Sequence, residues 1–388
     1  MTRSGTSTAP GRVNLIGDHT DYNHLPVLPM AIRQSVSVEF TSRGDNRVLL
    51  EPAREAGVPA DCAIVQHIPE APQGDWRNYV HAAAQAVASE SARLGIEPRG
   101  IEGTVSGDVP LAAGLSSSSA LVVAVGNALL ASSGIDIPAR DRMMLFAKAE
   151  RYVGTRGGGM DQAASIGGRA GHALLIRFDP LQVTPIPMPA DWRFLVIATG
   201  TTAEKSGDVQ AEYNRRVRLC SDALARVQLR ERHQWSYPAL LAELGLEGAL
   251  QAGRAALVDE AAKPDLLGCF IHTVSEAGRV EQASDAMSRG HATRFGELMT
   301  ESHISLREDY MVSSPVLEAA TAAALDAGAF GARLTGAGFG GSVVALFRAQ
   351  DVGDAKMEIE GRTQADALLS RARAFVARPS QGARVTLR

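Results

Sequence analysis

The chain has 388 residues, of which 45% are hydrophobic and 21% are charged, and its formal net charge is −4 at pH 7. This length exceeds what one simple hydrophobic core needs, so two domains are expected. The composition is that of an ordinary globular protein, and a small negative charge excludes a nucleic-acid partner, which would need a positive field.

The first informative stretch is residues 9–32, in which a short apolar segment at residues 13–16 is followed by a polar loop. Asp18, His19 and Asp21 there place carboxylates beside an imidazole. Carboxylates only accept hydrogen bonds, which suits the neighbouring hydroxyls of a sugar. A metal site is an alternative, although the spacing matches no common ligand set. An Asx-turn, in which the aspartates satisfy backbone amides, fits the stretch equally well when it is taken alone.

Alternation of apolar and polar residues then predicts strands at residues 35–41, 46–50 and 63–67. An alanine-rich helix follows, beginning near Trp76 and ending at Gly95. Trp76 and Tyr79 share one face of this helix. Ordinary packing explains this pair, and the functional alternative is a hydrophobic wall for an adenine ring.

Residues 107–130 run through the breakers Pro110 and Gly114 into four serines and an apolar helix predicted from Ala120. A helix N-terminus offers unpaired N–H groups and a positive dipole end, worth about 0.3–1 kcal/mol per charge interaction. We therefore predict a polyphosphate loop. A flexible linker or a membrane span are weaker alternatives, and no Walker A sequence occurs. The predicted ATP contacts in this loop are Ala112, Ala113, Gly114, Leu115, Ser116, Ser117 and Ser118.

A helix predicted to end near residue 154 carries Glu150, and three glycines then precede Asp161. Glycines allow unusual backbone angles and a close approach to a ligand, so packing explains a carboxylate there poorly. Asp161 is a candidate general base or positioning group for a hydroxyl nucleophile in phosphoryl transfer. A helix cap is the structural alternative.

Two further strands are predicted at residues 172–178 and 193–198, joined by a proline-marked connection. A boundary near Asp191 divides the chain into domains of residues 1–190 and 191–388. The pattern then predicts helices at residues 213–225, 240–257, 268–287 and 295–310, a glycine-rich loop at residues 331–341 and a strand at residues 342–347.

The three cysteines are far apart and form no Cys-x-x-Cys pair, so neither a disulfide framework nor a structural zinc site is expected. The first ten residues lack the apolar core of a secretory signal. We therefore expect reduced thiols, a cytoplasmic location and no membrane partner.

The stretches at residues 9–32, 107–130 and 331–347 together resemble the signatures of the GHMP kinase superfamily. The first of them resembles the galactokinase signature in particular. Residues 269–280, 301–306 and 375–383 extend the match. The resemblance implies an α+β fold of two domains, the first like ribosomal protein S5 domain 2 and the second ferredoxin-like. Sugar and MgATP would bind between them, and the anomeric hydroxyl of galactose would be phosphorylated. The protein is expected to be a monomer.

The same resemblance assigns roles to individual residues. Arg12 becomes the arginine that stabilises the transition state, and Asp161 the group at the reacting hydroxyl. The implied sugar contacts are Asp18, His19, Asp21, Gly158 and Tyr213. Trp76, Tyr79 and the residues of the serine loop become ATP contacts. Magnesium is expected near Ser118 or Ser117, together with Glu150.

Three departures from the family pattern leave the exact sugar open. The polar loop at residues 17–24, called the sugar loop below, has Asp18 where the family usually has a glutamate, which is one methylene longer. Residues 150–161 resemble N-acetylgalactosamine kinases and yeast-type galactokinases more than the usual bacterial form, and residues 199–206 replace the familiar stretch. A kinase for another hexose, such as N-acetylgalactosamine, and a non-catalytic sensor of galactose and ATP therefore stand as alternatives.

Overall fold

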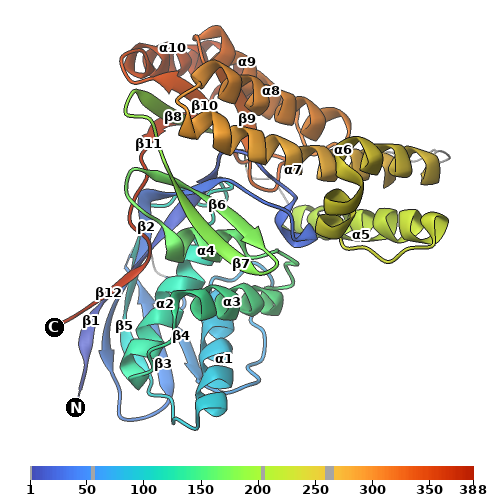
Figure 1. Cartoon of the computed structure of the whole chain (residues 1–388). Coiled ribbons are helices and arrows are strands. Elements are labelled where there is room, and N and C mark those ends of the chain that lie inside the picture. The colour runs from blue at the N-terminus through green and yellow to red at the C-terminus, as the bar shows by residue number, and fades with distance from the viewer. Residues whose placement is uncertain (1, 54–56, 202–205, 258–265) are drawn as a thin grey trace.

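A six-stranded sheet forms the lower part of the molecule in Figure 1, in the order β12-β1-β2-β5-β3-β4. The computed structural model describes residues 2–53, 57–201, 206–257 and 266–388. Neighbouring strands are antiparallel except for the parallel pair β3 and β5. The strands are β1 (Ser4–Asn14), β2 (Pro29–Ser42), β3 (Arg47–Pro52), β4 (Ala60–Ala63), β5 (Ile101–Gly107) and β12 (Arg384–Leu387).

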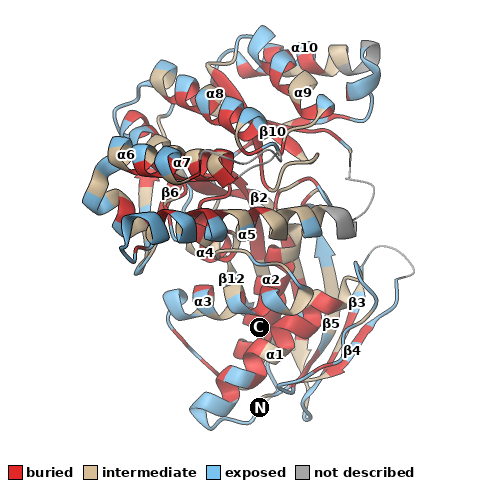
Figure 2. Ribbon diagram, turned by 90° about the vertical axis from the view of Figure 1, so that its right-hand side faces the viewer, coloured by how far each residue is buried: buried red, intermediate tan, exposed pale blue. Residues whose placement is uncertain are grey.

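The helices of this part pack against the sheet and against one another, with α2 at the centre. They are α1 (Arg77–Leu94), α2 (Ser117–Ser133), α3 (Ala139–Ala149) and α4 (Met160–Gly167). Helix α2 packs on β1, β2 and α1, and Figure 2 shows α1 and α2 largely in the colour of buried residues. A helix that is apolar on nearly all sides has to be buried, so its polar N-terminus marks the one end available to a ligand.

The upper part of Figure 1 contains a second, four-stranded antiparallel sheet in the order β11-β8-β10-β9. Its strands are β8 (Trp192–Ala198), β9 (Gly331–Thr335), β10 (Ser342–Arg348) and β11 (Arg373–Ala377). The helices are α5 (Ser206–Glu231), α6 (Tyr237–Ala256), α7 (Leu266–Ser288), α8 (Ala292–Glu308), α9 (Pro315–Asp326) and α10 (Val352–Ala365). A hairpin of β6 (His172–Phe178) and β7 (Leu181–Pro187) lies between the two sheets in the chain.

The two parts share hydrophobic packing. The rings of Trp192 and Phe194 in β8 contact Phe295 in α8, with centroids 5.1 and 5.8 Å apart. These residues belong to the same buried cluster as the core of the first sheet. Strand β12 also returns from the C-terminal half to pair with β1. The two halves therefore hold one another in place, and the boundary near Asp191 stays a prediction.

Most predicted elements are confirmed, and the following predictions differ from the structure. The strand expected at residues 63–67 lies instead at Ala60–Ala63, because its partner β3 begins at Arg47, directly opposite Ala63. The proline-marked connection contains β7, whose Pro185 and Pro187 are tolerated because its pairing is with β6 alone. The helix expected to reach residue 154 ends at Ala149 and continues as a 3₁₀ turn, η2 (Glu150–Val153). Of the divergent segment at residues 199–206, residues 202–205 lie outside the described residues.

Candidate active site

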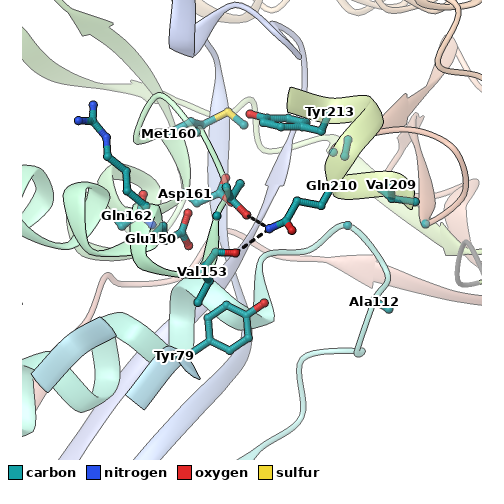
Figure 3. A pocket seen from close by; sticks show the side chains of 18 of the residues that line it. Tyr79, Ala112, Glu150, Val153, Met160, Asp161, Gln162, Val209, Gln210 and Tyr213 are labelled. Atoms are coloured by element: carbon teal, nitrogen blue, oxygen red, sulfur yellow. Dashed lines mark hydrogen bonds between the residues drawn. The ribbon is translucent and has the colours of Figure 1, made fainter. Parts of the chain in front are cut away.

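A cleft of ≈ 890 Å³ opens where the two parts meet, and both halves of the chain line it. Figure 3 shows Asp161 and Glu150 on one side and Gln210 and Tyr213 of α5 on the other. The predicted site residues among its lining are Arg12, Asp18, His19, Asp21, Tyr79, Ala112, Gly114, Glu150, Asp161 and Tyr213. Residues predicted from stretches hundreds of positions apart thus lie in one cavity.

The serine loop reaches the cleft at the N-terminus of α2. Gly114 and Ser116 both have left-handed backbones, with φ of 70° and 58°. A side chain at Gly114 would also approach the carbonyl oxygen of Thr335 to 3.0 Å. The Ser342 hydroxyl donates to the Ala113 carbonyl at 2.6 Å, so the glycine-rich loop before β10 packs against this loop. The start of α2 therefore lies next to two glycine-containing loops, and Gly114 and Gly336 of these loops line the cavity.

Asp161 joins the serine loop to strand β1. Its Oδ1 accepts hydrogen bonds from Arg12, with Nε at 2.8 Å and Nη2 at 2.7 Å. Its Oδ2 accepts from Ser116 at 2.6 Å and from Ser119 at 3.3 Å. The Asp161 side chain keeps 25% of its surface exposed, whereas Arg12 keeps 6%. The carboxylate is thus fixed in orientation and still accessible from the cleft.

Glu150 lies beside this pair and is in contact with a serine that the sequence analysis did not select. The Ser119 hydroxyl donates to Glu150 Oε1. Burial, followed by the charge of Asp161, raises the pKa of Glu150 to about 7. Ser118, the predicted magnesium residue, is hydrogen-bonded to Tyr79. Among the described residues no group of three or more His, Cys, Asp or Glu side chains could hold a metal ion.

The sugar loop contributes three polar residues with different surroundings. Burial lowers the pKa of His19 to about 3, so the imidazole is neutral. It donates from Nε2 to the Ala337 carbonyl at 3.2 Å, and Nδ1 lies 3.0 Å from the Tyr22 hydroxyl. The ring of Tyr213 lies 5.5 Å from that of His19.

Asp21 connects the sugar loop with the glycine stretch. Its Oδ2 accepts from the backbone N–H of Gly158 at 3.0 Å and of Met160 at 3.4 Å. Burial, followed by the charge of Asp161, raises the pKa of Asp21 to about 6. Gly158 itself is in direct backbone contact with residues 21–22.

Helix α5 is tied to the other side of the cleft. Gln210 donates to the Val153 carbonyl at 2.7 Å and to Thr155 Oγ1 at 3.1 Å, and Asn214 donates to the Gly154 carbonyl at 2.9 Å. The sequence analysis missed both amides. Because these bonds cross between the two halves of the chain, they fix α5 and its Tyr213 over the site.

Several predicted ATP contacts are not among the described residues that line the cleft. Trp76 donates from its indole Nε1 to the Val58 carbonyl at 3.2 Å. Ala113 and Leu115 are buried, and the Leu115 carbonyl accepts from the Arg12 amide at 3.1 Å. Ser116, Ser117 and Ser118 lie just behind the cavity wall at the start of α2.

Comparison with known families matches the chain in three places. GHMP kinases N terminal domain covers residues 78–169, GHMP kinases C terminal covers residues 283–376, and the Galactokinase galactose-binding signature covers residues 2–41. The fold is therefore that of a two-domain GHMP kinase, as expected from the sequence. A mevalonate kinase of Methanococcus jannaschii shares this fold at 16% identity, with a TM-score of 0.63 over 97% of this chain and 98% of its own.

Proteins with similar sequences show to which family of GHMP kinases the chain belongs. A galactokinase of Chloroflexus aggregans is 38% identical over 354 residues, covering 89% of this chain and 84% of its own length. One from Roseiflexus sp. is 35% identical, covering 96% and 91%. The crystal structure of Lactococcus lactis galactokinase complexed with galactose is 28% identical, with a TM-score of 0.84 over 98% of this chain and 95% of its own. The chain belongs to the galactokinase family.

Within the described residues, no helix combines the length and the apolar character that crossing a bilayer would require.

Proposed function

We propose that this chain is an ATP-dependent kinase that phosphorylates the anomeric hydroxyl of galactose. One observation carries the proposal: Asp161 Oδ2 accepts the Ser116 hydroxyl at 2.6 Å. The carboxylate assigned to the sugar hydroxyl and the helix start assigned to phosphate are thus one hydrogen bond apart. Phosphoryl transfer requires mainly this kind of positioning, together with stabilisation of charge.

In the proposed reaction the anomeric oxygen attacks the γ-phosphorus in line, and the bond to the bridging oxygen of ADP breaks. Asp161 accepts a hydrogen bond from the attacking hydroxyl and then its proton, or positions that hydroxyl while the proton leaves by another route. Arg12, fixed by Asp161, donates to oxygens of the transferring group. Amides at the start of α2 neutralise the charge that develops on ADP.

The proposed sugar contacts are His19, Asp21, Gly158 and Tyr213. The nitrogens of His19 are held by Ala337 and Tyr22, so His19 would contact the sugar through its ring. A carboxylate accepts hydrogen bonds, and a tyrosine supplies an apolar ring with a polar end. Asp18 borders the same cavity, and its carboxylate lies 2.6 Å from Arg333. N-acetylgalactosamine stays an alternative substrate, because residues 150–161 resemble kinases of that sugar.

For the nucleotide we propose the backbone of residues 112–118 around the phosphates and Tyr79 beside the adenine ring. Tyr79 lines the cleft and follows Asn78, whose side chain holds the loop at residues 71–72 through three hydrogen bonds. Trp76 supports that wall from behind, with its indole bonded to Val58.

A magnesium ion fits the oxygen groups beside the serine loop. Glu150 is buried near the charge of Asp161, a pairing that favours a cation. Mg²⁺ is often held by one or two carboxylates together with substrate phosphates. We propose Glu150 and Ser118 as its protein ligands, and comparing Ser118→Ala with Ser119→Ala in a Mn²⁺ titration would distinguish the two serines. When bound, the ion neutralises charge on the transferring phosphoryl group.

We also propose a monomeric, cytoplasmic enzyme. Cys62 and Cys220 are buried thiols outside any disulfide, which supports a reducing compartment. Sedimentation of the purified protein tests the oligomeric state.

The experiment that tests the proposed function is a panel of hexoses with coupled detection of ADP. We expect galactose to give the highest kcat/KM and the product to be galactose 1-phosphate. A preference for N-acetylgalactosamine would support the first alternative. Stoichiometric binding of galactose and ATP without ADP release would support a non-catalytic sensor.

A further inference from the structure

The dipeptide Gly17–Asp18 in the sugar loop is held by the C-terminal half of the chain on several sides. The Gly17 amide donates to Glu276 Oε1 at 2.9 Å. The Asp18 carbonyl accepts from His272 Nε2 at 3.1 Å, and Asp18 Oδ1 accepts from the Gly336 amide at 3.0 Å. Asp18 Oδ2 lies 2.6 Å from Arg333 Nη2. Both carboxylate oxygens are therefore engaged by groups from β9 and the loop that follows it.

This contact is shielded from solvent. The Asp18 side chain keeps 2% of its surface exposed and the Arg333 side chain keeps 0%. Oδ2 of Asp18 and Nη2 of Arg333 are both buried, and their 2.6 Å contact is an ion pair without well-directed hydrogen-bond geometry. A carboxylate so placed has little surface left to offer a sugar hydroxyl, even though the residue borders the cleft.

Arg333 is supported by further charges behind it. Its Nη2 lies 3.9 Å from Glu276 Oε1, which also accepts the Ser302 hydroxyl at 2.6 Å. Glu276 Oε2 accepts from Arg279 Nε at 2.7 Å. Burial opposes ionisation of Glu276, but the nearby positive charges, that of Arg279 first, outweigh it and lower its pKa to about 2. Arg333 is therefore a buried cation between two carboxylates, and its nearer counter-ion is Asp18.

We propose that Asp18 and Arg333 form an interdomain latch that sets the position of the sugar loop, so that Asp18 is a positioning residue and does not itself read a sugar hydroxyl. The proposal deepens the proposed function, on which it rests, because it leaves the hydrogen bonds to sugar hydroxyls to Asp21 and Tyr213. It also explains the shorter side chain at this position. An aspartate reaches Arg333 with its carboxylate withdrawn from the cavity, whereas a glutamate would push that group one methylene outward or displace the arginine.

Kinetics of Arg333 variants with galactose and a set of monodeoxygalactoses test the latch. A shift of about 1 Å in a positioning group can cost about 100-fold, so we expect Arg333→Met to reduce kcat/KM for galactose by about 10- to 100-fold. Every deoxy sugar should lose the same factor, because no single hydroxyl contact is removed. The KM for ATP should stay within about twofold, because phosphate contacts lie elsewhere. Arg333→Lys should recover part of the loss.

Asp18 variants separate positioning from direct contact. Asp18→Asn should lower kcat/KM for all the sugars by one common factor, and Asp18→Glu should also lower it. The Asp18→Asn/Arg333→Met double variant should lose much less than the product of the single losses, because the two side chains act as one unit. Arg348→Met is the matched control: this arginine lies on β10, with its side chain 53% exposed, and its kinetics should equal those of the parent protein.

Circular dichroism and thermal melting identify any variant that fails to fold, and Arg333→Lys and the double variant then carry the test. The proposal is overturned if Asp18→Asn affects galactose but spares one particular deoxy sugar, since that pattern identifies the hydroxyl that Asp18 contacts. A gain in kcat/KM for Asp18→Glu would overturn it as well. Turnover of galactose by the parent protein in the same assay tests the proposed function separately.

Discussion

Gly158 offers the sharpest test of how the sugar loop packs against the glycine stretch that precedes Asp161. A Cβ at this position would lie 2.2 Å from the Asp21 carbonyl carbon and 2.3 Å from the Tyr22 nitrogen. Both are backbone atoms, and ordinary contact begins at 3.4 Å. In Gly158→Ala the two loops must therefore separate by about 1 Å, which breaks the 3.0 Å bond from Gly158 to Asp21. A displacement of about 1 Å costs about 100-fold in rate, or roughly 3 kcal/mol.

The neighbouring glycine provides a matched control. Among the residues that the structure describes, a Cβ at Gly157 would meet only Glu150 Oε2, at 3.8 Å, so Gly157→Ala should keep kcat/KM within about threefold. Both variants are assayed by galactose-dependent ADP release at saturating ATP, with thermal melting to confirm folding. If Gly158→Ala retained the activity of the Gly157→Ala protein, the close packing of the two loops would have no part in catalysis.

Three further expectations follow from the same cleft. Asp161→Asn should lower kcat by roughly 10²- to 10⁴-fold, and an unchanged rate of ADP release would reject a role for the carboxylate. Because the pKa of Asp21 is raised to about 6, the carboxylate becomes protonated below that pH and loses its charge and part of its capacity to accept hydrogen bonds. Galactose affinity, measured by calorimetry, should therefore fall as the pH drops through about 6, and Asp161→Asn should move this loss to lower pH by removing a neighbouring charge; a flat profile would contradict it. Tyr79→Ala should raise the KM for ATP about tenfold without changing that for galactose, whereas Trp76→Ala should change neither by more than about twofold. Equal effects of the two substitutions would remove the distinction between them.

Local patterns in the sequence predict elements well where periodicity and breakers agree. The aliphatic run at residues 172–178 is strand β6, with the same bounds as predicted. At the serine loop the helix begins at Ser117 and not at Ala120, and the hydroxyl of Ser116 at the N-cap donates to Asp161 instead of capping the helix. The prolines of β7 led to the prediction of a connection in its place. Proline prevents strand pairing only where a neighbouring strand needs the missing N–H.

Side-chain partnerships at the site were harder to foresee, because they join distant segments. Nothing local distinguishes Ser119 from the serines before it, and its partner Glu150 is 31 positions away. Arg333 did carry a signal: it is an arginine within an otherwise apolar strand, and a charge in such a place requires a buried partner. The sequence does not say that this partner is Asp18, since only the folded chain brings them together.

The central claim is that nucleotide phosphates lie against the amides at the start of α2, within contact range of a sugar held beside Asp161. The most direct measurement is a crystal structure of the protein with galactose and a non-hydrolysable ATP analogue. Our account predicts the terminal phosphate at hydrogen-bonding distance from Arg12 and the amides of Ser116 to Ser118, with the anomeric hydroxyl between that phosphate and Asp161. A nucleotide bound away from α2, or a sugar turned so that another hydroxyl faces Asp161, would contradict it.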